Sequence, residues 1–339
     1  MENSAKASSL LNLESLDLGQ FLHGNESTQS KFAQQLITNL EASGIVKLKI
    51  DDVPTLKIVK LFDLTILKTK RFFSLDMTSK MVAAHPPQAS PHRGYSFVGQ
   101  EKLAGVTGFA EDSEKNSEIQ DNKETFDLGS PDDSEFPNRW PSECQIPQFR
   151  AIVEQHYEAL EQVQLQVLAA FALGLGLKRN FFSCLHEKSH HEMRLLHYPS
   201  TKVGDLIGGK TRIADHTDFG SVTLLFQDNT GGLEGRDRET GRYQAIESQP
   251  MECLVIVGDC FQRWTGNQVW AIPHRVTVPY RTAVEDNDCH VPERFSIAFF
   301  GKPNRDAQVG NLNHPRFQAM QYSSITAGEY NNMKLERTY

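Results

Sequence analysis

Apolar residues near the N-terminus follow a helical pattern and then a strand pattern. The helical spacing in SKFAQQLITNLEASGIVKLKI is kept by Phe32, Leu36, Ile37 and Leu40. Gly44 is a typical helix stop, and IVKLKI after it alternates as a strand. A second helix is expected to open near Asp52 and Pro54 and to run through VPTLKIVKLFDLTILKTKRFF.

Residues 78–141 lack such periodicity. They contain an acidic stretch rich in turn-forming residues, GFAEDSEKNSEIQDNKETFDLGSPDDSEFPNRWP, which is typical of a solvated loop. Long loops inside compact domains often serve as lids or binding loops. We therefore hypothesise that residues 106–135 close over an active site.

The C-terminal half begins with a long helical pattern and continues with short strand patterns. The helix is expected to start near Pro147, and Gly174 with Gly176 is expected to end it. After Arg194, apolar runs are divided by turn formers: MRLLHY, SVTLLFQ, YQAIE, CLVIVG, VWAIP, RVTVPY and RFSIAFF. Short strands at this spacing predict a β-sandwich or jelly roll rather than alternating β and α units.

Composition narrows the classes of partner. The 339 residues carry a net charge of −8, and no basic patch is present that could gather phosphates, so a nucleic acid or an acidic membrane is not expected. No stretch is apolar enough to span a bilayer, and the first residues lack the pattern of a secretory signal. The five cysteines are scattered and form no Cys-x-x-Cys, which favours a reducing interior. We expect a soluble cytoplasmic protein with a small-molecule partner and no evident protein partner.

One stretch has the spacing of a zinc metalloprotease motif. It is HEKSH, residues 186–190, and it matches His-Glu-x-x-His. That motif requires two histidines one turn apart on a stable helix. Here the stretch follows the glycine stop of the long helix and directly precedes a predicted strand, so few residues remain to build a helix. We predict that the match is accidental.

Three other residues form a more persuasive metal-binding set. On an extended strand, positions two apart face the same side, so His216 and Asp218 in IADHTDFGSVTLLFQ can converge on one ion. His274, in GDCFQRWTGNQVWAIPHRVTVPY, lies on another predicted strand. Two histidines and a carboxylate on a β scaffold form the facial triad of non-haem Fe(II) oxygenases, which leaves coordination positions open.

The strand PERFSIAFF carries a candidate carboxylate anchor. Alternation places Arg294, Ser296, Ala298 and Phe300 on one face. A guanidinium beside a hydroxyl can hold a carboxylate by charge-assisted hydrogen bonds. Taken alone, the strand is equally compatible with an arginine in an ordinary surface ion pair.

Several stretches together resemble one enzyme family. They are HTDFGSVTLLFQD, GDCFQRWTGNQVWAIPHRV, RFSIAFF, MRLLHYPS and KETFDLG. They are similar to the isopenicillin N synthase-like family of 2-oxoglutarate and Fe(II)-dependent oxygenases, over most of the chain and most specifically over residues 193–301. The resemblance implies a mainly β fold with a helical surround: a double-stranded β-helix (jelly-roll) core, a long helix packed on the sheet and an N-terminal helical and strand extension. Residues 1–145 would form the N-terminal region and 146–339 the core, as one structural unit.

The resemblance also implies site residues. His216, Asp218 and His274 would bind Fe(II). Arg294 and Ser296 would bind the distal carboxylate of 2-oxoglutarate, and the hydroxyl of Tyr198 would add to that anchor.

Two departures from the family pattern affect the implied cosubstrate site. Arg294 lies twenty residues after His274, which requires an extended hairpin through TAVEDNDCHV. The rival anchor, Arg281, has no hydroxyl two positions on. Leu196 stands where plant members often have Asn, so contacts near the iron differ there.

The implied function is oxidation of a C–H bond of a small organic molecule, plausibly in specialised metabolism, with O₂ consumed and succinate and CO₂ released. Candidate substrate contacts are Phe300, Phe126, Arg93 and Tyr95, for each of which ordinary packing is at least as good an interpretation. An iron oxidase that does not use 2-oxoglutarate is the alternative within the fold. A non-catalytic jelly-roll binding protein is disfavoured because the three iron ligands and the carboxylate anchor occur together.

Overall fold

The computed structural model describes residues 9–50, 58–87, 91–101, 121–207, 211–249, 252–282, 288–315, 317 and 321–336. The helices are α1 (Leu18–His23), α2 (Glu26–Ser43), α3 (Ile58–Phe73), α4 (Met77–Met81), α5 (Phe149–Gly174), the 3₁₀-helix η2 (Ser183–Leu185), α6 (Val203–Ile207), α7 (Asp259–Trp264) and α8 (Ala327–Leu335). No helix in these ranges combines the length and apolarity needed to cross a bilayer.

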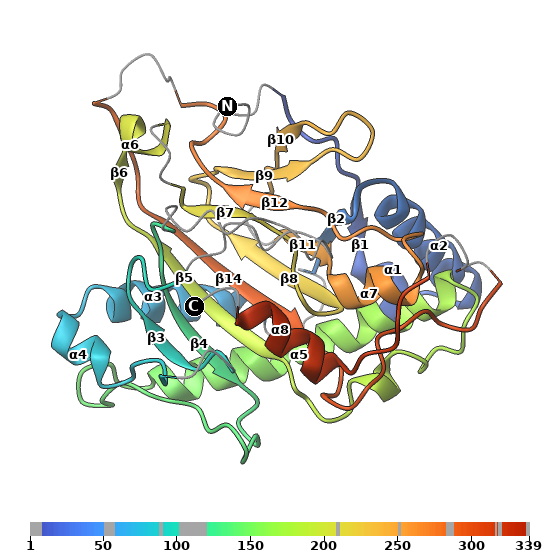
Figure 1. Cartoon of the computed structure of the whole chain (residues 1–339), viewed down its shortest axis with the longest axis horizontal. Helices are drawn as coiled ribbons and strands as arrows, with labels where there is room; N and C mark the ends of the chain where they lie inside the picture. Colours follow the sequence, from blue (N-terminus) through green and yellow to red (C-terminus); the bar gives the residue numbers. More distant parts are fainter. Residues whose placement is uncertain are drawn as a thin grey trace.

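The strands lie mainly in two sheets (Figure 1). The large sheet has the order β1 (Ser15–Asp17), β2 (Ile45–Lys49), β11 (Glu252–Val257), β8 (Val222–Gln227), β14 (Arg294–Gly301), β5 (Glu192–Tyr198), β4 (Glu124–Gly129) and β3 (Gly94–Ser96). The small sheet has the order β10 (Tyr243–Ala245), β9 (Leu233–Arg236), β12 (His274–Val276) and β7 (Ile213–His216). A separate pair joins β6 (Thr201–Lys202) to β13 (His290–Val291).

One hydrophobic cluster fills the space between the two sheets. It is made by inward-facing residues of both sheets, among them Leu196, Leu225, Ile256, Leu233 and Val276. Two packed sheets with the chain passing between them form the jelly-roll core that the sequence predicted. The N-terminal strands β1 to β4 extend both edges of the large sheet, whereas the division of the chain at residue 145 stays a prediction.

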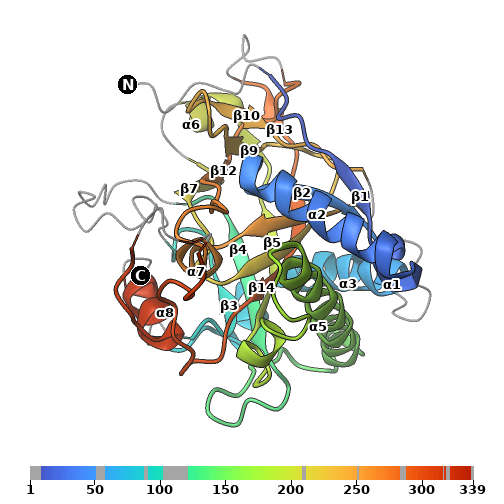
Figure 2. The ribbon, with the colours of Figure 1, turned by 90° about the vertical axis from the view of Figure 1, so that its right-hand side faces the viewer.

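A second hydrophobic cluster lies between the large sheet and the helices. Figure 2 shows α1, α2, α3 and α5 together on one side of the sheets, with α8 on the opposite side. The long helix begins and ends close to its predicted limits. Gly174 allows α5 to approach α2, because a Cβ there would lie 2.3 Å from the carbonyl oxygen of Ala33. Gly44 ends α2 in the left-handed conformation at φ 71°, as expected of a helix stop.

The predicted loop contains a strand. Residues 106–120 of the hypothesised lid lie outside the described residues, but Glu124–Gly129 forms β4 and pairs with β5. The expectation of an irregular segment was therefore wrong for β4. The charged residues of β4 made it resemble a solvated loop, because the partners that allow their burial are remote in sequence. Asp127, for example, accepts a hydrogen bond from Arg194 at 2.6 Å.

Three other expectations differ from the structure or fall outside it. Residues 269–273, the predicted strand VWAIP, have no regular structure and lead into β12. Residues 283–287 of the expected hairpin and residues 52–57, where the second helix was predicted to open, lie outside the described residues. The part of the hairpin that is described forms β13, which pairs with β6 rather than with its sequence neighbours β12 and β14.

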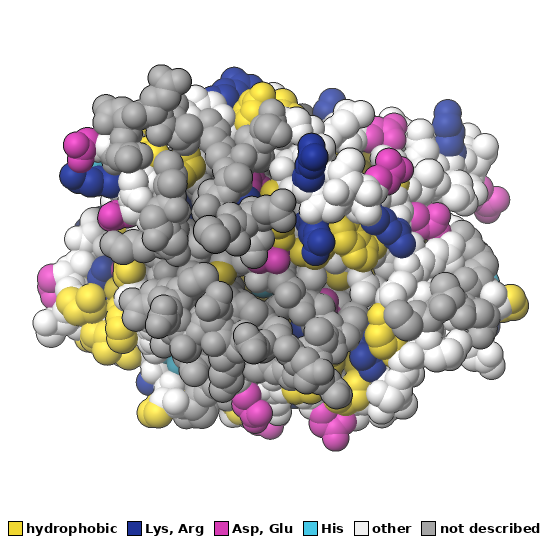
Figure 3. Space-filling view, turned by 45° about the horizontal axis from the view of Figure 1, so that its top comes forward, with side chains coloured by type: hydrophobic (Ala, Val, Ile, Leu, Met, Phe, Trp, Pro, Cys, Tyr) yellow, Lys and Arg dark blue, Asp and Glu magenta, His cyan; other side chains and the backbone are white. Residues whose placement is uncertain are grey.

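Charged side chains are interspersed on the exposed surface. On the face in Figure 3, Lys and Arg side chains of the described residues alternate with Asp and Glu side chains. This mixed distribution accompanies the overall charge of −8.

Candidate active site

Three predicted metal ligands converge at the ends of the small-sheet strands. His216 is the last residue of β7 and His274 the first of β12, and the two lie directly opposite each other in the antiparallel pair. Asp218 lies two residues beyond the end of β7, in the connection to β8. The expected convergence of Asp218 with His216 is present, although β7 ends at His216 and Asp218 lies outside the strand.

The ligand atoms of this triad face one another. Asp218 Oδ1 lies 4.0 Å from His216 Nε2 and 3.9 Å from His274 Nε2. Each imidazole has its other nitrogen, Nδ1, beside a backbone carbonyl oxygen, that of Ala214 at 2.9 Å and that of Ile272 at 3.1 Å. A proton on Nδ1 donates to the carbonyl and leaves the lone pair of Nε2 directed toward the centre, the usual arrangement of metal-binding histidines.

The environment of the triad suits a bound cation. Burial lowers the pKa of His216 well below its usual value, so the imidazole is neutral and can act as a ligand. Burial also raises the pKa of Asp218. Its Oδ2 atom is buried and lacks a hydrogen-bond partner among the described residues, which costs free energy unless a cation compensates it. The donor set of two imidazoles and one carboxylate fits Fe(II).

A cavity of about 50 Å³ joins the triad to the predicted carboxylate anchor. Arg294 and Ser296 line it from β14, Tyr198 lines it from β5, and the arginine Nη1 donates to the serine Oγ at 3.2 Å. The guanidinium carbon of Arg294 lies 4.7 Å from the centre of the Tyr198 ring. Leu196 also lines this cavity.

Arg294 has no carboxylate partner among the described residues. Its Nη2 donates to Gln227 Oε1 at 2.8 Å, and its Nε has no partner. A buried cation that meets only neutral groups is costly. The arrangement therefore favours an anionic ligand at this end of the cavity.

A second buried guanidinium at this end was not identified from the sequence. Arg212 is fully buried, its carbon lies 6.0 Å from the Tyr198 ring centre, and its Nε and Nη1 lack partners among the described residues. Burial and the nearby Arg294 lower the pKa of Arg212 to about 10. Gln227 could have been found, since it ends the run SVTLLFQ on the same strand face as Leu225. Arg212 precedes β7 and carries no comparable pattern.

The rival anchor Arg281 lies elsewhere. Its side chain is 75% exposed and forms a surface ion pair with Glu247 at 2.8 Å. It does not line the cavity of the triad. The choice of Arg294 over Arg281 therefore agrees with the geometry.

A second cavity of about 50 Å³ lies beside the triad. Phe300 lines both cavities, as expected of a residue on the Arg294 face of β14. The other lining residues include four charged or titratable groups that the sequence analysis did not select: His92, Glu192, Arg194 and Lys302. Sequence alternation within β5 places Glu192 and Arg194 on the same face as Tyr198, which is the signal that could have found them.

The other predicted substrate contacts lie away from the triad. Phe126 and Tyr95 are opposite each other in the β3 and β4 pair and are buried in the cluster beneath the helices. Alternation in β4 explains this, because Asp127 faces Arg194 and its neighbour Phe126 must face the other way. Arg93 is bound to Asp133 at 3.0 Å and to Glu192 at 3.4 Å. The structure thus places Phe300, and none of these three, with the triad.

Phe126→Ala is expected to lower stability and leave iron binding intact. Its ring is fully buried and lies 5.0 Å from that of Phe72 and 5.2 Å from that of Phe149, between centres. Truncation leaves a cavity that costs about 3–5 kcal/mol of the free energy of unfolding, which denaturant titration would measure. Phe97→Ala is the matched control, since Phe97 is 42% exposed. A small effect at Phe126 combined with loss of the metal would contradict this placement.

The HEKSH stretch does not adopt the helical geometry of the zinc motif in this fold. Residues 186–190 are not helical. His186 is buried, with Nε2 2.8 Å from Ser221 Oγ and Nδ1 2.7 Å from the carbonyl oxygen of Phe182, and burial lowers its pKa to about 4. His190 instead accepts a hydrogen bond from the backbone of Arg305 at 3.0 Å. The stretch thus lacks the helix that the zinc motif requires, which supports the prediction of an accidental match.

One further group of potential ligands is already neutralised. His92, Glu101 and Asp127 lie close enough together to hold an ion. Arg194 donates to Glu101 Oε1 at 2.8 Å and to Asp127 Oδ1 at 2.6 Å, however, and Lys123 also pairs with Glu101. Since these cations already occupy the carboxylates, the triad of His216, Asp218 and His274 is the better candidate metal site.

Comparison with known proteins gives matches along most of the chain. Residues 13–143 match the family model of the non-haem dioxygenase in morphine synthesis N-terminal region, and residues 189–303 match that of the 2OG-Fe(II) oxygenase superfamily. The chain is 40% identical to the 2-oxoglutarate-Fe(II) type oxidoreductase ppzD of Metarhizium rileyi, over 96% of this chain and 91% of the relative. It is 38% identical to the Proline hydroxylase buaE of Petromyces alliaceus, over 97% and 100%.

Solved structures show the same architecture. A full-length Neurospora crassa protein, crystallised in complex with alpha-KG and thymine, superposes with a TM-score of 0.84 at 27% identity, and the match covers 100% of both chains. That protein thus holds the cosubstrate and a small molecule together in this fold.

Proposed function

Since the chain belongs to the 2OG-Fe(II) oxygenase superfamily and is therefore an enzyme that uses Fe(II) and 2-oxoglutarate, we propose that His216, Asp218 and His274 bind the iron. The observation that carries this proposal is the convergence of two histidine Nε2 atoms on a buried carboxylate whose Oδ2 has no partner among the described residues. The two backbone carbonyl groups behind the imidazoles support it, because they fix each ring for coordination.

We further propose that Arg294, Ser296 and Tyr198 bind the distal carboxylate of 2-oxoglutarate. The absence of a carboxylate partner for Arg294 among the described residues supports this, as do the two neutral groups, Ser296 and Gln227, that orient its guanidinium. Arg212 adds positive charge at the same end of the cavity. A dicarboxylic cosubstrate would thus lie with one end at the anchor and the other at the triad.

Bound Fe(II), with 2-oxoglutarate and O₂, supplies the oxidation of a C–H bond and the release of succinate and CO₂. The chain itself binds and orients the two organic molecules and excludes water. Phe300 lines both cavities and would therefore contact both the cosubstrate and the substrate. This oxidation does not require a side chain that acts as a general base.

We propose that the substrate is a small organic molecule held in the cavity lined by Phe300, Phe219 and the charged residues near the triad. The names of relatives support this class, and Proline hydroxylase makes L-proline an early compound to test. A cytoplasmic location is part of the same proposal and is supported by the odd, scattered cysteines.

Anaerobic addition of Fe(II) and then 2-oxoglutarate to metal-free protein tests this proposal. We expect the weak visible charge-transfer absorption of the keto acid on ferrous iron, and succinate once oxygen is admitted. Binding of iron without the absorption would contradict the assigned cosubstrate cavity and favour an oxidase that does not use 2-oxoglutarate.

A further inference from the structure

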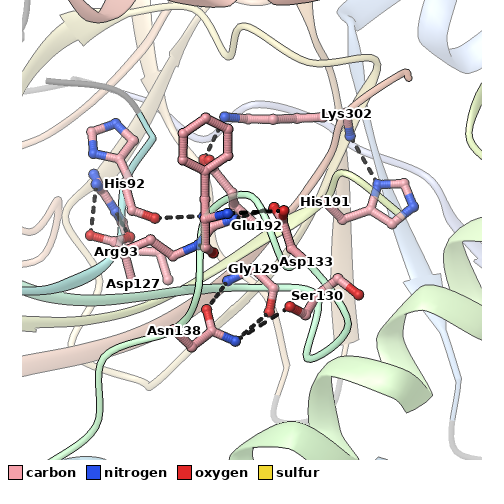
Figure 4. A network of polar contacts seen from close by, with 12 residues as sticks. His92, Arg93, Asp127, Gly129, Ser130, Asp133, Asn138, His191, Glu192 and Lys302 are labelled. Atoms are coloured by element: carbon pink, nitrogen blue, oxygen red, sulfur yellow. Dashed lines mark hydrogen bonds and ion pairs between the residues drawn. The ribbon is translucent and has the colours of Figure 1, made fainter. Parts of the chain in front are cut away.

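An ion pair inside the substrate cavity is not needed for iron or 2-oxoglutarate. It joins the ammonium of Lys302 to the carboxylate of Glu192, and their side chains are only 13% and 5% exposed (Figure 4). Both residues line the cavity beside the triad and also a neighbouring cavity of about 220 Å³ bounded by α8. The pair therefore stands where the two cavities meet.

Strand register places this pair at the opposite end of the site from the carboxylate anchor. In the β5 and β14 pair, Tyr198 lies opposite Arg294, and Glu192 lies opposite Phe300. Lys302 follows two residues after Phe300, beyond the end of β14. Glu192 and Tyr198 are six residues apart on one strand, which corresponds to roughly 20 Å. The Lys302–Glu192 pair consequently belongs to the substrate end.

Lys302 retains hydrogen-bonding capacity toward the cavity. Glu192 is the one hydrogen-bond acceptor of its ammonium group among the described residues, although an ammonium group has three donors. Its backbone N–H donates to His191 Nδ1 at 3.1 Å, which fixes the start of the side chain (Figure 4). A buried ammonium that lines a cavity and has one protein acceptor favours a ligand that supplies further acceptors.

Glu192 keeps its negative charge in this environment. Burial by itself would raise the pKa of Glu192, but Lys302, His92 and Arg93 outweigh it and hold the value at about 2. Arg93 is in turn fixed by Asp133 at 3.0 Å and by the carbonyl oxygen of His92 at 2.7 Å (Figure 4). The cavity therefore presents a fixed negative group beside a positive one.

The other cation of the cavity is more fully engaged. Arg194 makes paired hydrogen bonds to Asp127 at 2.6 and 3.0 Å and to Glu101 at 2.8 and 3.0 Å. Two carboxylates thus hold its guanidinium, whereas Lys302 is held by one that it shares with Arg93. Among these two cations, Lys302 is the better partner for an incoming anion.

We propose that the cavity recognises a compact zwitterion, a free α-amino acid, whose carboxylate binds Lys302 and whose ammonium binds Glu192. This inference rests on the proposed function and names its substrate class. A purely anionic ligand would be repelled by Glu192, and a purely cationic ligand would be repelled by Lys302. An apolar ligand would leave the ammonium donors without acceptors. A zwitterion complements both charges. The cavity next to the triad shares Glu192 and Lys302 with the neighbouring cavity of about 220 Å³, which adds room for a ligand beside the pair.

A panel of the twenty proteinogenic amino acids, each beside its α-carboxamide, tests the proposal on the iron-loaded full chain. Succinate formation with 2-oxoglutarate is measured, and mass spectrometry detects oxidised product. We expect at least one amino acid to raise succinate formation above the rate without substrate and to yield product, while its amide does neither. For that amino acid, Lys302→Met is expected to raise KM about 10- to 100-fold, and Lys302→Arg to restore most of the loss.

Lys80→Met is the matched control. Lys80 forms a buried ion pair with Glu124 at 2.7 Å, and Glu124, like Glu192, keeps another donor when the lysine is lost, in this case Tyr95. Lys80 lies outside both cavities of the site. We expect this variant to retain the parent KM for the amino acid, and all variants to retain the parent KM for 2-oxoglutarate.

Three results would overturn the zwitterion proposal. They are turnover of the amide as efficient as that of the amino acid, equal effects of Lys302→Met and Lys80→Met, and no stimulation by any amino acid in a protein that still shows the 2-oxoglutarate absorption. Absence of that absorption in the parent would instead contradict the proposed function. If Lys302→Met does not fold, the comparison of acid and amide on the parent decides the question.

Discussion

His216→Ala is expected to abolish the absorption of 2-oxoglutarate on ferrous iron and the formation of succinate. The substitution removes one of the three proposed ligands, whose atoms all lie within 4.8 Å of one another. Loss of a group that merely orients a ligand already costs roughly 10- to 100-fold in metal affinity or activity, so loss of the ligand itself should exceed that range. Anaerobic titration with Fe(II), read by absorption and by bound metal, measures the effect.

His186→Ala is the appropriate control for the histidine substitution. His186 is buried like His216, but its ring nitrogens lie beside Ser221 Oγ and the carbonyl oxygen of Phe182. We expect the control to lose some stability and to bind iron as the parent does. If His186→Ala lost iron while His216→Ala retained it, the metal would belong to the HEKSH stretch, and the proposed triad would be wrong.

Arg294→Ala is expected to raise the 2-oxoglutarate concentration needed for half-saturation by about 100-fold, with iron binding unchanged. A charge-assisted hydrogen bond contributes about 1.5–3 kcal/mol, and a guanidinium can make two of them to one carboxylate. Titration of the visible absorption with 2-oxoglutarate at saturating Fe(II) gives the constant directly. The predicted change concerns the cosubstrate alone, because Arg294 lies in the cavity away from Lys302 and Glu192.

Arg281→Ala provides the comparison for Arg294→Ala. It removes the same side chain from a surface ion pair in which the arginine is 75% exposed. Exposed pairs of this kind contribute little to stability, and we expect 2-oxoglutarate binding equal to that of the parent. If Arg281→Ala were the variant with weakened binding, the cosubstrate would lie outside the cavity of the triad.

The sequence was sufficient to predict a jelly-roll core because its short apolar strand patterns are divided at regular intervals by turn-forming residues. The run RFSIAFF predicted both a strand and the shared face of Arg294, Ser296 and Phe300, and β14 with its cavity bears out that arrangement. The glycine stop at Gly44 was equally predictable, because the left-handed conformation that ends α2 suits glycine. In these places local pattern and tertiary structure agree.

Sequence patterns were insufficient where a residue depends on a distant partner. The strand β4 was missed because Asp127 is typical of a polar loop. The burial of Asp127 is made possible by Arg194, which lies 67 residues away in the sequence. Phe126, predicted to contact the substrate, faces the helices because its neighbour Asp127 faces Arg194 on the opposite side of β4. Arg212 and Lys302 were missed because their significance comes from other parts of the fold: the ring of Tyr198 near Arg212, and the cavity that Lys302 shares with residues of β5. No window of neighbouring residues contains that information.

The common alignment of β5 and β14 has a consequence for how this enzyme can change in evolution. Substitutions at Glu192 or Lys302 alter one end of the strand pair and leave the proposed cosubstrate anchor of Tyr198 and Arg294 unchanged at the other end. A single deletion inside β5 would instead reverse the facing of every residue on one side of it. Point mutations at the Glu192 end of these strands can therefore change the substrate that is bound. Changes in strand length cannot, because they would also displace the residues of the other end.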